Sequence, residues 1–164
     1  MLKTFATICI IGMFTSSCTS KKASRTEGSH EAEQDLTMIV GTYTSGDSKG
    51  LYSFRFNEEN GTATALSEAE VENPSYLVPS ADGKFIYAVS EFSNEQAAAN
   101  AFAFNKEEGT FRLLNTQKTG GEDPCYIITN GSNVVTANYS GGSISVFPID
   151  KDGSLLPASE VVKF

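Results

Sequence analysis

The stretch NPSYL at residues 73–77 recurs as DPCYI at residues 123–127, about 50 residues further along the chain. Each copy holds a proline after Asn or Asp, and a tyrosine two residues after that proline. A turn sequence repeats with it, as NEENG at 57–61, NKEEG at 105–109 and DKDG at 150–153. Repeats of about 40–50 residues that hold four short strands are typical of β-propeller blades.

Alternation of apolar residues and the chemistry of the turns place strands in three successive units. In the middle unit we expect strands at 75–79, 84–90, 100–105 and 110–116, and in the third unit at 126–129, 133–139, 143–149 and 155–163. The first unit lacks an innermost strand, and its strands are expected at 37–44, 50–57 and 62–70. No window has the apolar spacing and caps of a helix. The sequence therefore predicts an all-β propeller of four-stranded antiparallel blades.

The number of units bears on the extent of the protein. Known propellers close rings of about four to eight blades. We therefore expect residues 36–164 to be the first three blades of a ring of about seven, continuing beyond Phe164, with the missing blades as a partner surface. The 164 residues alone are then expected to show neither activity nor cooperative unfolding. A complete small protein is the alternative, and it would leave strand edges unpaired.

The N-terminal segment is expected to be a targeting signal. Lys3 precedes an apolar stretch at 5–14 that is too short to span a bilayer, and small residues then lead into Cys18. This arrangement resembles the lipobox of bacterial lipoproteins, although Thr15 replaces the usual aliphatic residue. We expect a lipoprotein signal peptide at 1–17, a disordered tether at 18–35, and lipidation of Cys18 that anchors an exported protein to a periplasmic or outer-membrane surface. An ordinary secretory signal is the alternative.

Composition excludes several classes of function. The net charge is -8, with 12 Lys and Arg against 20 Asp and Glu, so the chain has no electrostatic footprint for nucleic acid. The three cysteines do not fall at the spacing of a zinc site or a disulfide framework, and we expect no metal or cofactor. The single histidine, His30, lies in the expected tether. No His-dependent mechanism can therefore come from this chain.

Several motifs together point to a family. The segments VGTYT at 40–44, NPSYL at 73–77, DGKFIYAVSE at 82–91 and ANYSGG at 137–142 resemble the start of bacterial lactonases, seven-bladed propellers that include 6-phosphogluconolactonases. The resemblance implies hydrolysis of a sugar δ-lactone to the open acid, which needs a positioned water, a general base and stabilisation of the oxyanion. The family's His-rich catalytic segment belongs to later blades, so no catalytic residue is carried over to this chain.

One mouth of the expected channel collects the candidate site residues. The start of each innermost strand and the end of the next strand meet there, and the residues at those positions are Tyr43, Thr44, Asn73, Ser75, Glu91, Cys125, Tyr126 and Tyr139. Glu91 is the ionisable carboxylate of the set and the candidate base or hydroxyl acceptor; a solvated loop residue is the alternative. Tyr126 stands where relatives carry His, which weakens a proton-transfer role. Cys125 is expected to be a buried free thiol.

Two functions stay open on the sequence. One is a lactone hydrolase, either 6-phosphogluconolactonase-like or an aldonolactonase, and the other is a non-catalytic exported propeller that binds a carbohydrate or a protein partner. Export suits a cytosolic sugar-phosphate pathway poorly, and Arg55, Arg112 and the scattered lysines do not gather into a phosphate site. An unphosphorylated aldonolactone is therefore the substrate hypothesis.

Overall fold

The computed structural model of the protein describes residues 35–164, which form eleven β-strands and, within that range, no helix. The predicted all-β class is confirmed. The expected signal peptide, Cys18 anchor and nearly all of the tether lie outside the described residues. Within residues 35–164, no helix is long and apolar enough to cross a membrane.

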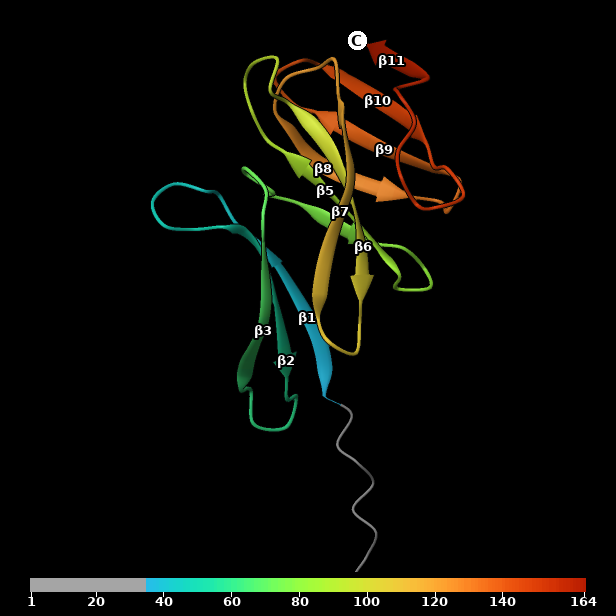
Figure 1. The fold of residues 1–164 in the computed structure, drawn as a ribbon. Coiled ribbons are helices and arrows are strands. Elements are labelled where there is room, and N and C mark those ends of the chain that lie inside the picture. The colour runs from blue at the N-terminus through green and yellow to red at the C-terminus, as the bar shows by residue number, and fades with distance from the viewer. Residues whose placement is uncertain (1–34) are drawn as a thin grey trace, which may run out of the picture. The chain divides into compact units, whose positions relative to one another are not determined.

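The strands form three antiparallel sheets in chain order (Figure 1). The first sheet holds β1 (Leu36–Gly41), β2 (Gly50–Phe56) and β3 (Ala63–Glu70). The second holds β4 (Leu77–Pro79), β5 (Phe85–Ser90), β6 (Ala98–Asn105) and β7 (Thr110–Lys118), and the third holds β8 (Pro124–Thr129), β9 (Asn133–Asn138), β10 (Ser143–Pro148) and β11 (Glu160–Lys163). Consecutive strands pair, so each sheet is a meander of the kind that forms a propeller blade. We call these sheets blades 1, 2 and 3.

Blade 2 is packed on both faces, and β5 shows why. Ile86 and Ala88 point to one side, into an apolar cluster with Leu51 of blade 1. Tyr87 and Val89 point to the other side, into a second cluster with residues of blade 3. Side chains alternate across a strand, so the nearly continuous apolar run of β5 supplies a core to each neighbour. This strand is therefore covered on both faces by the neighbouring blades.

Glycine turns join the blades at their outer halves. Gly109 in the β6–β7 turn has φ 73°, and its carbonyl oxygen accepts a hydrogen bond from Ser53 Oγ of blade 1 at 2.6 Å. Gly153, at the matching position of blade 3, has φ 87°, and its carbonyl accepts a hydrogen bond from Tyr87 Oη of blade 2 at 3.1 Å. Gly61 occupies the same turn in blade 1, where a Cβ would meet nothing within 4 Å.

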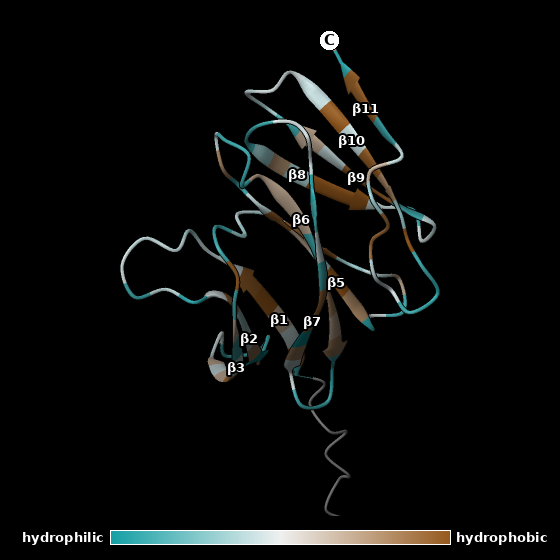
Figure 2. Ribbon diagram, turned by 45° about the horizontal axis from the view of Figure 1, so that its top comes forward, coloured by the Kyte–Doolittle hydropathy of each residue, from teal (hydrophilic) through white to brown (hydrophobic). Residues whose placement is uncertain are grey.

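Blade 3 is packed on one face only among the described residues. Along β9 and β10 burial alternates, with Val134 and Phe147 fully buried against blade 2. Val135 and Val146, which pair across the strands, lie half-buried on the opposite face. Figure 2 shows the hydrophobic residues along β8 and β10. This apolar but uncovered face is the one that a further blade would bury.

Several predicted strand limits are wrong. The innermost strand of the middle unit begins at Leu77 rather than residue 75, because Ser75 donates its N–H to the Asn73 carbonyl in a tight turn. The last strand begins at Glu160 rather than residue 155. Leu155 instead forms an isolated bridge with Ile149, and the intervening segment contains a proline that cannot donate to the ladder.

Candidate active site at the mouth of the blades

The repeated segments that enter blades 2 and 3 share an unusual backbone. Asn73 and Asp123 have φ of 46° and 51°, the only described non-glycine residues with positive φ, in the left-handed region that Asn and Asp tolerate best. Their carbonyl oxygens accept the N–H groups of Glu91 at 3.0 Å and Tyr139 at 2.9 Å. Each linker therefore holds the exit of the second strand of its blade beside the entry of the first.

Hydroxyl groups of the preceding blade hold each linker. The N–H and Oγ1 of Thr44 donate to Asn73 Oδ1 at 3.1 and 3.0 Å, which joins blade 1 to blade 2. Ser93 Oγ donates to Asp123 Oδ1 at 2.7 Å, which joins blade 2 to blade 3 in the same way. The mouth is thus built from a repeated contact between consecutive blades, and that contact fixes the positions of the side chains beside it.

Glu91 is the carboxylate at the first of these junctions. Its side chain accepts a hydrogen bond from Ser75 Oγ, and the carboxylate also interacts with Tyr43, whose pKa it raises. Asn73 Nδ2 also donates to the Glu91 backbone carbonyl at 3.2 Å. Glu91 is half-buried, and the Ser75 hydroxyl holds its carboxylate by a hydrogen bond.

The charges at the mouth shift two titrations. The hydrogen bond to Glu91 raises the pKa of Tyr43, with smaller contributions from burial and from the negative charges of Glu91 and Asp123, so its phenol stays neutral. Hydrogen bonds from Ser140 and Ser93 lower the pKa of Asp123, so this carboxyl is ionised at neutral pH. The mouth therefore holds an ionised carboxylate at Asp123 and a neutral phenol at Tyr43.

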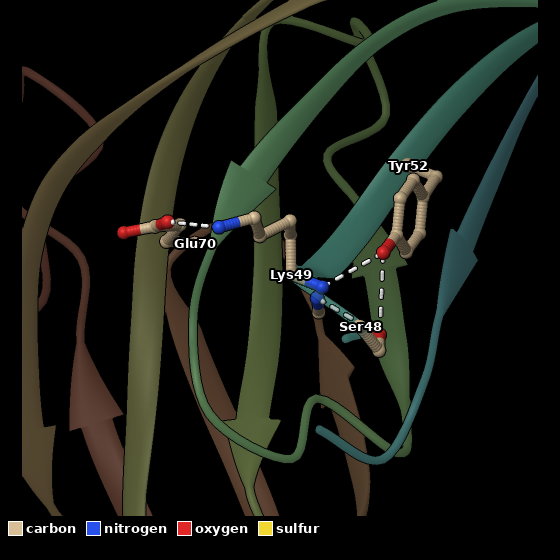
Figure 3. Close-up of polar contacts among 5 residues, drawn as sticks. Ser48, Lys49, Tyr52 and Glu70 are labelled. Carbon is tan, nitrogen blue, oxygen red and sulfur yellow. Dashed lines mark hydrogen bonds and ion pairs between the residues drawn. The ribbon is translucent and has the colours of Figure 1, made fainter. Parts of the chain in front are cut away.

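The loop that carries Tyr43 is anchored at its far end (Figure 3). Tyr52 Oη accepts the Lys49 N–H at 2.7 Å, and Lys49 Nζ pairs with Glu70 at 2.8 Å. Ser48 Oγ lies 2.5 Å from Thr42 Oγ1, which ties the end of the loop to its beginning. These contacts tie together the two ends of the loop that carries Tyr43.

The second junction carries different side chains. Cys125 occupies the position of Ser75 in the repeat, and Tyr139 occupies that of Glu91. Cys125 is exposed, so the prediction of a buried thiol is wrong: a register shift between Pro124 and Tyr126 turns it outward. Tyr139 is 81% exposed and no side-chain hydrogen bond is recorded for it.

Two residues of the mouth were missed by the sequence analysis. Tyr76 lies 4.9 Å from Tyr126 between ring centroids, and Asp123 joins blades 2 and 3. Both belong to the repeated segments, so the repeat itself was the signal. Tyr126 was named on the sequence, and the structure places it beside Tyr76 across the boundary between β4 and β8.

The arrangement can do two kinds of chemistry. A carboxylate held by hydroxyl groups can take a proton from a water molecule or accept hydrogen bonds from sugar hydroxyls. Within residues 35–164, no group of three or more His, Cys, Asp and Glu side chains is placed to hold a metal ion.

Comparison with known proteins identifies the family. The profile of the family described as lactonase, 7-bladed beta-propeller, matches residues 37–164, so the chain belongs to this family. It is 38% identical over 128 residues to a 6-phosphogluconolactonase of Bacillus subtilis, covering 74% of this chain and 36% of that protein. It is 33% identical to a 6-phosphogluconolactonase of Formosa agariphila, covering 77% of this chain and 37% of the relative.

Solved structures agree with this membership. A Bacteroides fragilis protein provisionally assigned as a 6-phosphogluconolactonase is 69% identical, with a TM-score of 0.80 over 82% of this chain and 38% of that one. The periplasmic gluconolactonase of Pseudomonas aeruginosa is 30% identical, with a TM-score of 0.71 over 77% of this chain and 38% of that one. The 164-residue chain thus spans a little over a third of the length of the relatives it matches.

Proposed function

We propose that this chain forms part of an enzyme that hydrolyses a sugar δ-lactone to the open acid. The observation that carries the proposal is the Glu91 carboxylate, held by Ser75 at the mouth of a lactonase-family propeller. The names of the Bacillus and Formosa relatives support a sugar lactone as the substrate.

In this proposal Glu91 acts as the general base. It accepts a proton from a water molecule that attacks the lactone carbonyl carbon. The ring C–O bond breaks as the tetrahedral intermediate collapses, and the proton held by Glu91 passes to the departing ring oxygen, which becomes a hydroxyl group. Ser75 acts as a positioning residue that fixes the carboxylate by a hydrogen bond. The donors that stabilise the oxyanion are assigned to blades other than these three.

We propose further that the active protein contains more blades than the three described. The chain covers 36–38% of its relatives, and the outer face of blade 3 is apolar and uncovered among the described residues. The complete protein, read from the gene on either side of these codons, is therefore the form to assay.

Acid release from D-glucono-1,5-lactone, followed with a pH indicator, tests the hydrolase directly. The complete protein is expected to exceed the spontaneous rate, whereas residues 1–164 alone are expected to match it. A complete, folded protein that never exceeds the spontaneous rate with gluconolactone or its 6-phosphate overturns the proposal.

A non-catalytic carbohydrate-binding or protein-binding propeller is the second candidate. It is favoured by the absence of histidine from residues 35–164, which removes a common general base from the described blades. Saturable binding of a sugar without acid release by the complete protein would select this candidate.

The cellular location is also a proposal. Export with lipidation of Cys18 is supported by the small residues before that cysteine in the sequence. Metabolic labelling with a palmitate analogue is expected to mark the wild-type protein and to be lost in Cys18→Ser. Equal labelling of both proteins contradicts the anchor.

A further inference from the structure

The aromatic pair at the entry of blades 2 and 3 has no role in the proposed chemistry. Tyr76 and Tyr126 each expose 43% of their surface, although their ring centroids are 4.9 Å apart and their planes meet at 51°. Large aromatic side chains of a core bury most of their area, as Tyr87 does at 1%. Among residues 35–164, the two rings therefore present open aromatic surface where the innermost strands of two blades meet.

The pair lies next to the carboxylate site along the chain and across the sheet. Tyr76 follows Ser75, which donates to Glu91, and the Tyr76 carbonyl accepts the Val89 N–H from the strand that leads to Glu91. The ring pair therefore begins one residue from the side chain that binds the Glu91 carboxylate. Aromatic surface beside a hydrogen-bonding carboxylate suits a ligand with an apolar C–H face and a rim of hydroxyl groups.

The charge at this mouth selects among such ligands. Glu91 and Asp123 carry negative charge, and within residues 35–164 neither forms an ion pair, since the recorded pairs are Lys49 with Glu70 and Lys84 with Asp82. An anionic group approaching these two carboxylates is repelled. The described blades thus favour a neutral sugar over its phosphate.

We propose that Tyr76 and Tyr126 form a stacking platform for the ring face of an unphosphorylated sugar lactone, next to the Glu91 carboxylate. This deepens the proposed function and rests on it for the identity of the ligand. The positive C–H edges of the sugar ring lie against the negative faces of the tyrosine rings. The tyrosine at position 126 then contributes ring surface to the site and no proton.

Binding of D-glucono-1,5-lactam, which cannot be hydrolysed as the lactone is, tests the platform apart from catalysis. We expect Tyr126→Leu in the complete protein to bind the lactam five- to tenfold more weakly, because leucine keeps apolar bulk but lacks an aromatic face. Tyr126→Phe is expected to stay within twofold of the parent. Leu113→Ala, on an exposed position of β7 outside the mouth, serves as the control and is expected to change nothing.

A separate variant tests the preference for a neutral ligand over a phosphorylated one. Asn73 already occupies the left-handed position that corresponds to Asp123, so Asp123→Asn removes a charge without a change of shape. We expect the parent to bind the lactam at least tenfold more tightly than its 6-phosphate, and Asp123→Asn to narrow that preference two- to threefold.

The outcomes separate the two proposals. Equal lactam affinity in Tyr126→Leu and the parent, or tighter binding of the 6-phosphate, overturns the platform even if gluconolactone is hydrolysed. Lactam binding that depends on the aromatic ring, without acid release from gluconolactone or its 6-phosphate, supports the platform and overturns the hydrolase.

Discussion

Blades 2 and 3 repeat one scaffold and differ in what they place on it. In both, the side chain of an Asn or Asp in the left-handed conformation accepts a hydrogen bond from a hydroxyl group of the preceding blade. The backbone carbonyl of the same residue accepts the N–H of the residue that follows the second strand. Blade 2 sets Ser75 and Glu91 on this scaffold, whereas blade 3 sets an exposed Cys125 and an exposed Tyr139 on it. The repeat is therefore an architectural device, and the chemistry depends on the few side chains that depart from it.

The same two blades differ in burial. β5 is covered on both faces, while β9 alternates between buried and half-buried residues of similar polarity. The open face of blade 3 carries apolar side chains, among them Val135 and Val146. This is the face that the proposed further blades would cover.

We expect the largest effect from removing the Glu91 carboxylate, since blade 3 has Tyr139 at the matching position. Glu91→Gln in the complete protein should lower kcat for gluconolactone about 100-fold, because an amide cannot take a proton from water. Glu122→Gln, an exposed neighbour of the second junction, is the matched control and should leave kcat unchanged. Equal activity of Glu91→Gln and the parent would remove Glu91 from the mechanism.

Two glycines test the packing between blades. Gly61 and Gly109 occupy corresponding turns of blades 1 and 2 and have φ of 71° and 73°. Alanine therefore strains the backbone at each position by about 1–2 kcal/mol. A Cβ at Gly109 would also lie 2.8 Å from the Leu66 Cβ, which adds about 1–3 kcal/mol of overpacking. Urea unfolding of the complete protein should show Gly109→Ala as the less stable variant. Equal losses would mean that this turn does not pack against blade 1.

Two neighbouring valines of β9 test how the two faces of blade 3 differ in burial. Val134→Thr buries a hydroxyl against blade 2 and should cost about 1–3 kcal/mol. If a further blade covers the opposite face, Val135→Thr should approach that cost in the complete protein. A loss near zero for Val135→Thr, measured by the same urea unfolding, would leave that face open to water.

Much of this architecture can be predicted from the sequence, and the reasons are local. The glycine turns and the apolar run of β5 depend on short-range chemistry, so they can be predicted. The repeated segments show how many times the blade unit occurs. The exposure of Cys125 depends on a register shift that no periodicity encodes. The approach of Tyr43 to Glu91 depends on how blade 1 is rotated against blade 2, so the sequence could place both at one mouth but could not pair them.

The interaction between Tyr43 and Glu91 is the central claim, because it couples blade 1 to the carboxylate of blade 2. Carbon-13 NMR of the tyrosine Cζ atoms through an alkaline titration, with Tyr43→Phe to assign the signal, measures it directly. The pKa of Tyr43 should lie above the ordinary value for tyrosine in the parent and fall toward it in Glu91→Gln, because the amide is a weaker acceptor for the phenol's hydrogen bond and carries no charge to repel the phenolate. A pKa of Tyr43 that is the same in both proteins would contradict the account.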